Sequence, residues 1–328
     1  MLKLRQFYTL TVLTAVESIK QPICLLLAAA CYLLTAMTPL LLMHHFGEDG
    51  KLARDSGLAL HFLFGLFIAC YTASSCLDRE MRKGTASAVL SKPIGRDTFF
   101  LAKFAGTVLV ILLFSFGASM ATLLSERVSM KFTMEPGLVG YITDNQTGAL
   151  LIAAPFVAFV IAGLINYLAR RPFESTAFIL LLCSVATVMI VSGFFNRSGD
   201  WSPYDLRIHE GIIPVSLMVT LALIVISSIA ITLSSRLSIV PTLMICSSIF
   251  LLGMMSDYLF GKKAMESVFV MVVYRLIPDW QNFWTVDALS EGGTVPWRYV
   301  LHASGYAFSY TTGILLLGLV SFNSKEMR

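Results

Sequence analysis

Eight long apolar runs dominate the chain, and shorter polar segments that carry most of the charged residues separate them. Each run is about 20 residues or longer, the length at which an α-helix crosses the hydrocarbon core of a bilayer. The pattern predicts an all-α polytopic membrane protein with a single transmembrane domain over residues 1–328 and about eight crossings, within a range of six to eight. The predicted crossings are 22–43, 57–77, 99–124, 148–168, 176–195, 212–234, 239–259 and 303–322.

The composition agrees with this class. Hydrophobic residues make up 56% of the 328 residues and charged residues 13%, whereas soluble domains carry roughly 25% charged residues. The mean hydropathy is +0.77. These values exclude an ordinary soluble protein, and a net charge of +4 gives no indication of a nucleic-acid partner.

The distribution of charge predicts the orientation. With the amino terminus in the cytoplasm, the inner segments hold 14 basic and six acidic residues, and the outer segments hold ten and 14. Cytoplasmic loops of membrane proteins carry an excess of lysine and arginine, so a balance of +8 inside and −4 outside favours this placement. We therefore expect both termini and the 78–98 segment in the cytoplasm.

Two segments outside the predicted crossings have distinct patterns. Residues 1–21 predict an amphipathic helix on the inner membrane surface, and the alternative is that they begin a long first helix. Residues 260–302 predict an outer re-entrant or interfacial region, because the apolar stretch 267–277 is too short to cross and contains Arg275. Trp280, Phe283 and Trp284 then follow, as expected of chain at the headgroup level.

The motifs of common enzymes are absent from the sequence. No GxxxxGK[ST] phosphate loop, HExxH or GxSxG occurs, so we expect neither ATP hydrolysis nor other enzymatic activity in this chain, and no bound cofactor or metal. His44 and His45 are adjacent, which points them to different sides of a helix, so we interpret them as the start of a polar loop.

The first half of the 78–98 segment predicts an extension of the second membrane helix. Asp78 and Arg82 have the i,i+4 spacing of a helical ion pair, and Gly84 is a typical residue at which a helix ends. We therefore expect the second helix to continue past the membrane as a charged turn.

The second half predicts a short helix between two sharp turns. Thr85 can cap a helix over 86–91, Pro93 ends it, and Asp97 is expected to cap the next membrane helix. Val89 and Leu90 are candidate apolar contacts on this helix, which suits docking into a groove of a soluble partner. The alternative is that the basic residues serve only to anchor the membrane topology.

This segment resembles the permease subunit of type-2 ABC exporters. In that family the corresponding connection has the form E-x-x-x-G-T, then L-S-x-P, then R, then K-x-x-G at the start of the next helix. The matching residues here are Glu80, Gly84, Thr85, Leu90, Ser91, Pro93, Arg96, Lys103 and Gly106.

The resemblance implies a function for the chain. Residues between Glu80 and Arg96 would form a coupling helix against a separate ATP-binding cassette subunit, which would bind ATP and Mg²⁺. Two permease copies would enclose the substrate path in a prokaryotic plasma (inner) membrane. The implied partner-coupling residues are Glu80, Gly84, Thr85, Val89, Leu90, Ser91, Pro93 and Arg96.

Two other functions remain open at this stage. An ion-coupled secondary transporter needs an ionisable ligand within the membrane, and the candidates are His61 and Asp257. A noncatalytic scaffold would recruit partners through the same cytoplasmic segment without moving a solute. The spans are uniformly apolar, so the sequence does not indicate the substrate.

Overall fold

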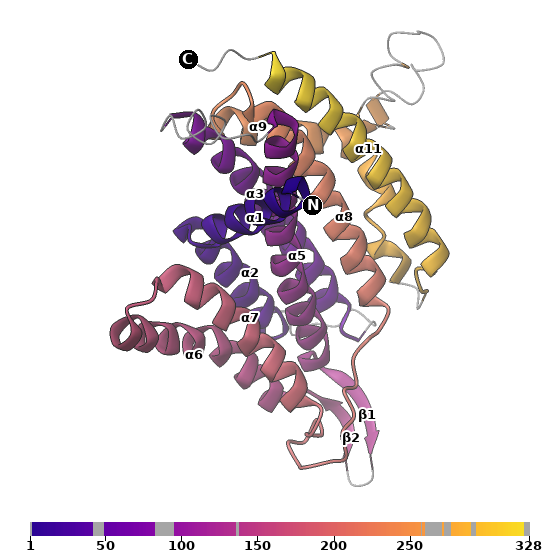
Figure 1. Ribbon diagram of the computed structural model, residues 1–328. Coiled ribbons are helices and arrows are strands. Elements are labelled where there is room, and N and C mark those ends of the chain that lie inside the picture. Colours follow the sequence, from indigo (N-terminus) through magenta and orange to yellow (C-terminus); the bar gives the residue numbers. More distant parts are fainter. Residues whose placement is uncertain are drawn as a thin grey trace.

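A computed structural model describes residues 2–41, 49–82, 95–135, 138–256, 258–259, 271, 277–289 and 293–324. The side chains at 2–3, 79–82, 134–135 and 138 lie outside this description. Helices and one β-hairpin make up the described chain (Figure 1). The helices are α1 (Leu2–Ile19), α2 (Pro22–Leu41), α3 (Lys51–Arg82), α5 (Arg96–Val128), α6 (Asn145–Ala169), α7 (Phe173–Ser192), α8 (Ile212–Ser234), α9 (Ile239–Met254) and α11 (Trp297–Asn323).

The short elements lie in the connections. Strands β1 (Lys131–Glu135) and β2 (Leu138–Ile142) pair antiparallel, with Lys131 opposite Ile142. Two 3₁₀ turns, η3 (Trp280–Asn282) and η4 (Val286–Leu289), precede α11. We call the end of the molecule that carries the β-hairpin the hairpin end. The opposite end, where α3 ends and α5 begins, is the loop end (Figure 1).

The predicted class is confirmed. Among the described residues, seven helices are long and apolar enough to cross a membrane, which is within the predicted range of six to eight. These helices are α2, α3, α5, α6, α7, α8 and α11. The predicted crossing at 239–259 is different, because α9 has only 16 residues and rises about 24 Å, less than the roughly 30 Å of a hydrocarbon core.

The chain nevertheless returns from one end of the bundle to the other between α8 and α11. At the loop end, Arg236 after α8 donates to the carbonyl of Ser321 near the end of α11, at 2.9 Å. At the hairpin end, Gly211 before α8 lies beside Leu289, which precedes α11. The two helices are therefore parallel, and the chain from α9 to η4 must make the return that one long helix was expected to make.

The described segment before α11, residues 277–289, packs against neighbouring helices. Trp280 and Phe283 are each 2% exposed, and Phe283 faces Tyr306 of α11 with ring centroids 5.8 Å apart. The Trp280 indole donates to the carbonyl of Ile249 in α9. Neighbouring helices cover both rings, and the expectation that these aromatic residues lie at the headgroup level stays a prediction.

Helices α3, α5 and α8 form the centre of the larger core. Within the most apolar window of each helix, 78% of α8 and 72% of α3 is buried, against 28% of α11. A second core joins α2 and α5 to the α6–α7 pair. Figure 1 shows this pair as an antiparallel hairpin set to one side of the central helices. The outer faces of α6 and α11 are rich in exposed large apolar residues, as expected of surfaces in contact with lipid.

Helix α1 is separate from α2 and crosses the first third of α5 (Figure 1). Its buried residues include the small Thr14 and Ala15, whereas Leu4 and Tyr8 are 79% and 69% exposed. The alternative of one long first helix is wrong, since the chain turns between Ile19 and Pro22. The position of α1 on the membrane surface stays a prediction.

Gly106 allows α1 to approach α5 closely. A Cβ at this position would lie 2.6 Å from the Cβ of Thr14 and 2.8 Å from the carbonyl oxygen of Thr11. Close backbone approach at a small residue is a usual way for helices to pack in membranes.

We expect Gly106→Leu to displace α1 and to destabilise the protein by about 1–3 kcal/mol, the usual range for overpacking a tight contact. Thermal unfolding in detergent and protease cleavage between α1 and α2 would measure the effect. The matched control is Gly163→Leu in α6, where an added Cβ meets nothing within 4 Å. Equal effects of the two substitutions would contradict this account of the α1 contact.

Candidate coupling site

The predicted coupling segment joins α3 to α5 at the loop end. Glu80 lies in the last turn of α3, where the structure describes the backbone alone, and Arg96 is the first residue of α5. The other predicted coupling residues lie outside the described residues, namely Gly84, Thr85, Val89, Leu90, Ser91 and Pro93. The predicted short helix at 86–91 also lies outside them. The assignment of these residues to a partner contact therefore stays a prediction.

The start of α5 differs from the prediction. Gly95, with extended backbone angles, holds the N-cap position, and Asp97 lies in the first helical turn. The Asp97 side chain does not cap the helix but accepts a hydrogen bond from the Asn323 side-chain amide of α11, between Oδ1 and Nδ2 at 2.9 Å. An acidic residue in the first turn is still favourable, because it faces the positive end of the helix dipole.

Arg96 and Asp97 both bind the last residue of α11. The Arg96 guanidinium donates from Nη1 to the backbone carbonyl of Asn323 at 3.2 Å. Asn323 therefore accepts from one residue at the start of α5 through its carbonyl and donates to the next through its side chain. All three residues are exposed.

Aromatic side chains pack beside these polar contacts. Phe322 stacks on Phe99 with ring centroids 6.0 Å apart and lies 5.6 Å from Phe100. Gly318 permits this approach, because a Cβ there would lie 2.7 Å from the Phe100 ring and 2.6 Å from Thr232 Oγ1 of α8. The end of α11 thus packs between α5 and α8.

Arg236 binds the same end of α11 from the α8 side. Its Nη2 donates to the Ser321 carbonyl at 2.9 Å and to Ser324 Oγ at 2.6 Å, and its Nε donates to Ser321 Oγ at 3.3 Å. The carbonyls at a helix C-terminus have no partners within the helix, and arginine is well suited to bind them. We call the group of Arg96, Asp97, Arg236, Ser321, Asn323 and Ser324 the loop-end junction.

Lys103, a residue of the family-like motif, lies under α1. Its side chain is 1% exposed, and its ammonium is 3.9 Å from the Glu17 carboxylate of α1 and 5.6 Å from the centre of the Phe99 ring. The ammonium therefore does not extend to water, as a snorkelling lysine would. Cation–π and ionic attraction stabilise it beneath the helix that covers it.

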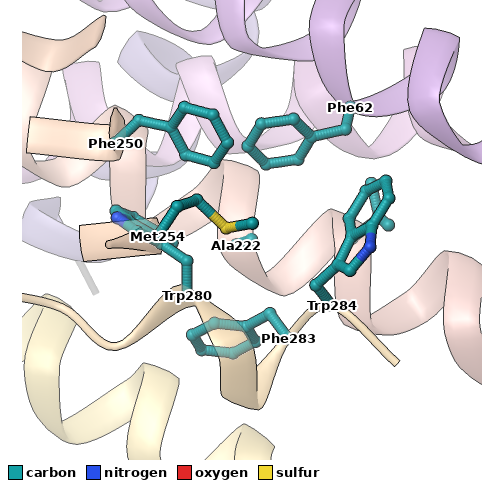
Figure 2. Close-up of a pocket in the computed structure, with 8 residues that line it drawn as sticks. Phe62, Ala222, Phe250, Met254, Trp280, Phe283 and Trp284 are labelled. Carbon is teal, nitrogen blue, oxygen red and sulfur yellow. The ribbon is translucent and has the colours of Figure 1, made fainter. Parts of the chain in front are cut away.

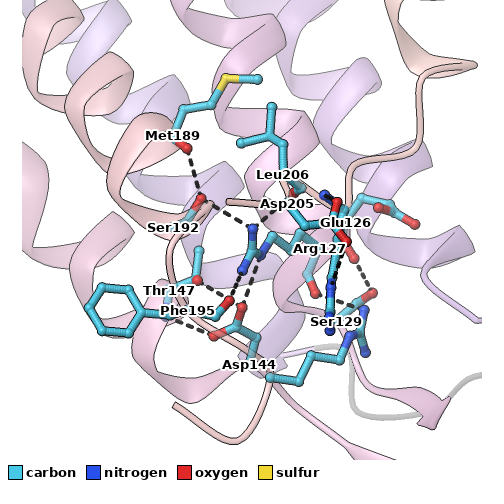
Figure 3. A network of polar contacts seen from close by, with 12 residues as sticks. Glu126, Arg127, Ser129, Asp144, Thr147, Met189, Ser192, Phe195, Asp205 and Leu206 are labelled. Carbon is cyan, nitrogen blue, oxygen red and sulfur yellow. Dashed lines mark hydrogen bonds and ion pairs between the residues drawn. The ribbon is translucent and has the colours of Figure 1, made fainter. Parts of the chain in front are cut away.

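A second polar cluster lies at the hairpin end (Figure 3). Arg127, at the end of α5, is 1% exposed and donates from Nε to the carboxylate of Asp144 at 3.0 Å. Asp144 is fully buried and caps α6, accepting from the amide and the hydroxyl of Thr147. This arrangement satisfies both partners of a buried ion pair.

Arg127 also binds the chain between α7 and α8. Its two terminal nitrogens donate to the carbonyls of Leu206 at 2.9 Å and Phe195 at 2.8 Å, and Nη1 lies 3.4 Å from Ser192 Oγ at the end of α7. One guanidinium therefore fixes α5 to the start of α6, the end of α7 and the connection to α8 (Figure 3).

Arg197 extends this cluster. Its guanidinium donates to the carbonyls of Arg127 and Ile142. Burial lowers the pKa of Arg197, and the carboxylates of Glu126 and Asp144 oppose that shift. Glu126 in turn pairs with Lys131 at the base of the hairpin. No sequence motif indicates this cluster, because its members are spread between Glu126 and Leu206 over several helices and connections.

An apolar pocket lies where the segment 277–289 meets α3, α8 and α9 (Figure 2). Aromatic rings surround it, and the side chain of Met254 points into their midst. Phe62 and Phe250 have ring centroids 4.6 Å apart. The lining residues are Phe62, Val219, Ala222, Phe250, Met254, Trp280, Phe283 and Trp284, none of which offers a charged group.

The ionisable candidates within the membrane are separate from these sites. His61 is fully buried against Phe114, and neither of its ring nitrogens has a hydrogen-bond partner. Asp257, His44 and His45 lie outside the described residues. In the part of the chain that the structure describes, no three histidine, cysteine, aspartate or glutamate residues come close enough to hold a metal ion.

Comparison with known proteins agrees with the architecture. Residues 18–178, just under half of the chain, match the family described as ABC-2 family transporter protein. The match runs from the end of α1 into α7 and includes the whole connection between α3 and α5. This part of the chain is therefore similar to the type-2 ABC transporter permeases, the family that the sequence resemblance predicted. No curated protein and no solved structure matches the chain.

We expect Asp144→Ala to destabilise the protein by about 3–5 kcal/mol, because the substitution leaves the buried Arg127 charge without its partner. Thermal or denaturant unfolding in detergent would measure the loss. The matched control is Asp205→Ala, which breaks the exposed pair between Asp205 and Arg207, and such pairs contribute at most about 1 kcal/mol. A loss at Asp144 no larger than that at Asp205 would show that the buried pair does not fix the hairpin end.

Proposed function

We propose that this chain is the membrane-spanning permease subunit of an ATP-binding cassette exporter, driven by ATP hydrolysis on a separate subunit. The family match over residues 18–178 carries the proposal, since it includes the segment in which the family-like motif occurs. ATP and Mg²⁺ would bind to the partner, because this chain has no phosphate-binding loop. Two copies of the chain, or this chain and a related permease, would enclose the substrate path.

The packing of α3 and α5 supports a coupling role for the segment between them. Both helices run the length of the bundle, and both contribute buried residues to the core around α8. Protein interiors are close-packed and transmit displacement rather than absorb it. A partner that pulls or pushes on the 83–95 connection would therefore move the loop ends of α3 and α5 together, which is the kind of rigid-body change that opens and closes transporters.

The charge distribution supports the orientation. Arg96 and Arg236 lie together at the loop end, and the predicted inner segments have a net charge of +8. We propose that this end faces the cytoplasm of a prokaryotic cell and that both termini lie there, because lysine and arginine are retained on the cytoplasmic side. The hairpin end, with its buried ion pair, would then face outward.

One observation favours the rival function of an ion-coupled transporter. A buried histidine without a hydrogen-bond partner is costly and is found at proton pathways in membranes, and His61 has these properties. However, the structure joins it to no ionised partner among the described residues, and the contact that it does show is with the Phe114 ring. The family match therefore supports the ATP-driven function better.

We expect Gly84→Trp to reduce the amount of ATPase subunit that co-purifies from native membranes by about tenfold, as loss of a central interface contact does. Quantitative mass spectrometry of the purified complex would measure it. The control is the pair Arg170→Ala and Arg171→Ala, exposed basic residues in the turn between α6 and α7. Unchanged assembly in the Gly84 variant, with the permease inserted normally, would refute the coupling role.

The rival functions give different results in membrane vesicles that contain the complex. We expect solute movement to continue when an ionophore collapses the ion gradient and to stop when ATP is removed. The substitution His61→Phe keeps an aromatic ring against Phe114, and we expect it to preserve ATP-driven transport. Transport that follows the gradient and is lost in the His61 variant would instead establish ion coupling, and a scaffold would move no solute in any condition.

A further inference from the structure

The last residue of α11 lies directly beside the exit of the coupling segment. Asn323 accepts from Arg96 through its carbonyl at 3.2 Å and donates to Asp97 through its side chain at 2.9 Å. Both contacts join residues more than 220 positions apart in the sequence. They bring the end of the chain to the point where the coupling segment enters the bundle.

We propose that Asn323 is a positioning residue that makes the end of α11 move together with the coupling segment. This inference rests on the proposed role of that segment in binding an ATPase subunit. The segment would thus move α11 as well as the two helices that it joins covalently.

The side-chain packing next to Asn323 can transmit a movement from α5 to α11. Phe322 packs on the rings of Phe99 and Phe100 of α5. Gly318 lies against Phe100 and Thr232, where a side chain would force the helices apart. Polar bonds at the end and aromatic rings below them therefore resist both sliding and separation.

The junction continues into α8. Arg236 binds Ser321 and Ser324, and Ser235 Oγ lies 3.1 Å from Ser321 Oγ. Since α8 is the most deeply buried helix of the described bundle, a displacement of the α11 end reaches the centre of the core. Coupling of distant sites needs such a continuous set of packed and hydrogen-bonded groups.

The hydrogen bonds of the loop-end junction would become stronger when water is excluded from it. Asp97, Arg96 and Asn323 are open to water in the isolated chain, and hydrogen bonds that compete with water contribute little. A subunit that docks on the coupling segment would also exclude water from these neighbouring residues. The same bonds would then lie in a medium of lower dielectric constant and would strengthen.

The test exchanges the hydrogen-bond donor and acceptor between Asp97 and Asn323. In Asn323→Asp, two carboxylates face each other across the junction, and the bond to Asp97 is lost. In the double variant Asp97→Asn with Asn323→Asp, the amide lies on α5 and the carboxylate on α11, so a bond of the same kind forms again. The control is Thr312→Ala on the exposed side of α11, where the hydroxyl bonds to its own helix.

The readout is the movement of α11 in the assembled complex. Spin labels at Phe308→Cys and Leu164→Cys, both exposed positions on α11 and α6, report the distance between these helices in nanodiscs. The exposed Cys183 is replaced in all samples. Distances are measured without nucleotide and with ATP and vanadate, and the amount of bound ATPase subunit is measured in the same samples.

We expect a nucleotide-dependent change of distance in the parent complex and in the Thr312 control. In Asn323→Asp we expect the ATPase to stay bound and most of the distance change to be lost. The double variant should recover most of the nucleotide-dependent change of distance. A full change in Asn323→Asp, or no recovery in the double variant, would overturn the role of Asn323 and leave the proposed function intact. Absence of bound ATPase from the parent sample would instead refute the proposed function.

Discussion

Polar contacts at the two ends of the bundle determine how its helices are placed, because lipid supplies no hydrophobic force that draws apolar helices together. Between the ends, close van der Waals packing of apolar and small residues holds the helices together. At the two ends, buried or paired charged groups are stable only in a few relative positions of the helices. Arg127 at the hairpin end and Asn323 at the loop end are the centres of these contacts.

The two ends differ in strength. The Arg127–Asp144 pair is fully buried, and every charged atom of the pair has a partner, so any movement there would expose charge to a medium of low dielectric constant. The loop-end junction is exposed, and water can replace its hydrogen bonds at little cost. A bundle fixed at one end and adjustable at the other can pivot, which agrees with force applied at the loop end.

The segment before α11 shows how a membrane chain can turn back without a full crossing. Trp280 and Phe283 are buried among helices, and the Trp280 indole satisfies the carbonyl of Ile249 near the end of α9. Irregular backbone in a membrane protein is tolerated where protein covers it, and neighbouring helices cover Trp280 and Phe283. The aromatic pocket around Met254 is the place where this segment meets the central helices (Figure 2).

The sequence by itself determined the class and the positions of seven long helices, because the need to satisfy backbone hydrogen bonds in lipid acts on each helix separately. It also determined the family-like segment after α3, because that motif lies within one continuous stretch of chain. It could not show that Asp97 binds Asn323, that Lys103 lies beneath α1, or that Arg127 joins four segments. Those contacts unite residues from distant parts of the chain, and only packing decides which of them meet. The same limit explains why 239–259 appeared to cross: its composition is that of a spanning helix, but Gly253 lies against Trp280 and Pro278, and the helix ends there.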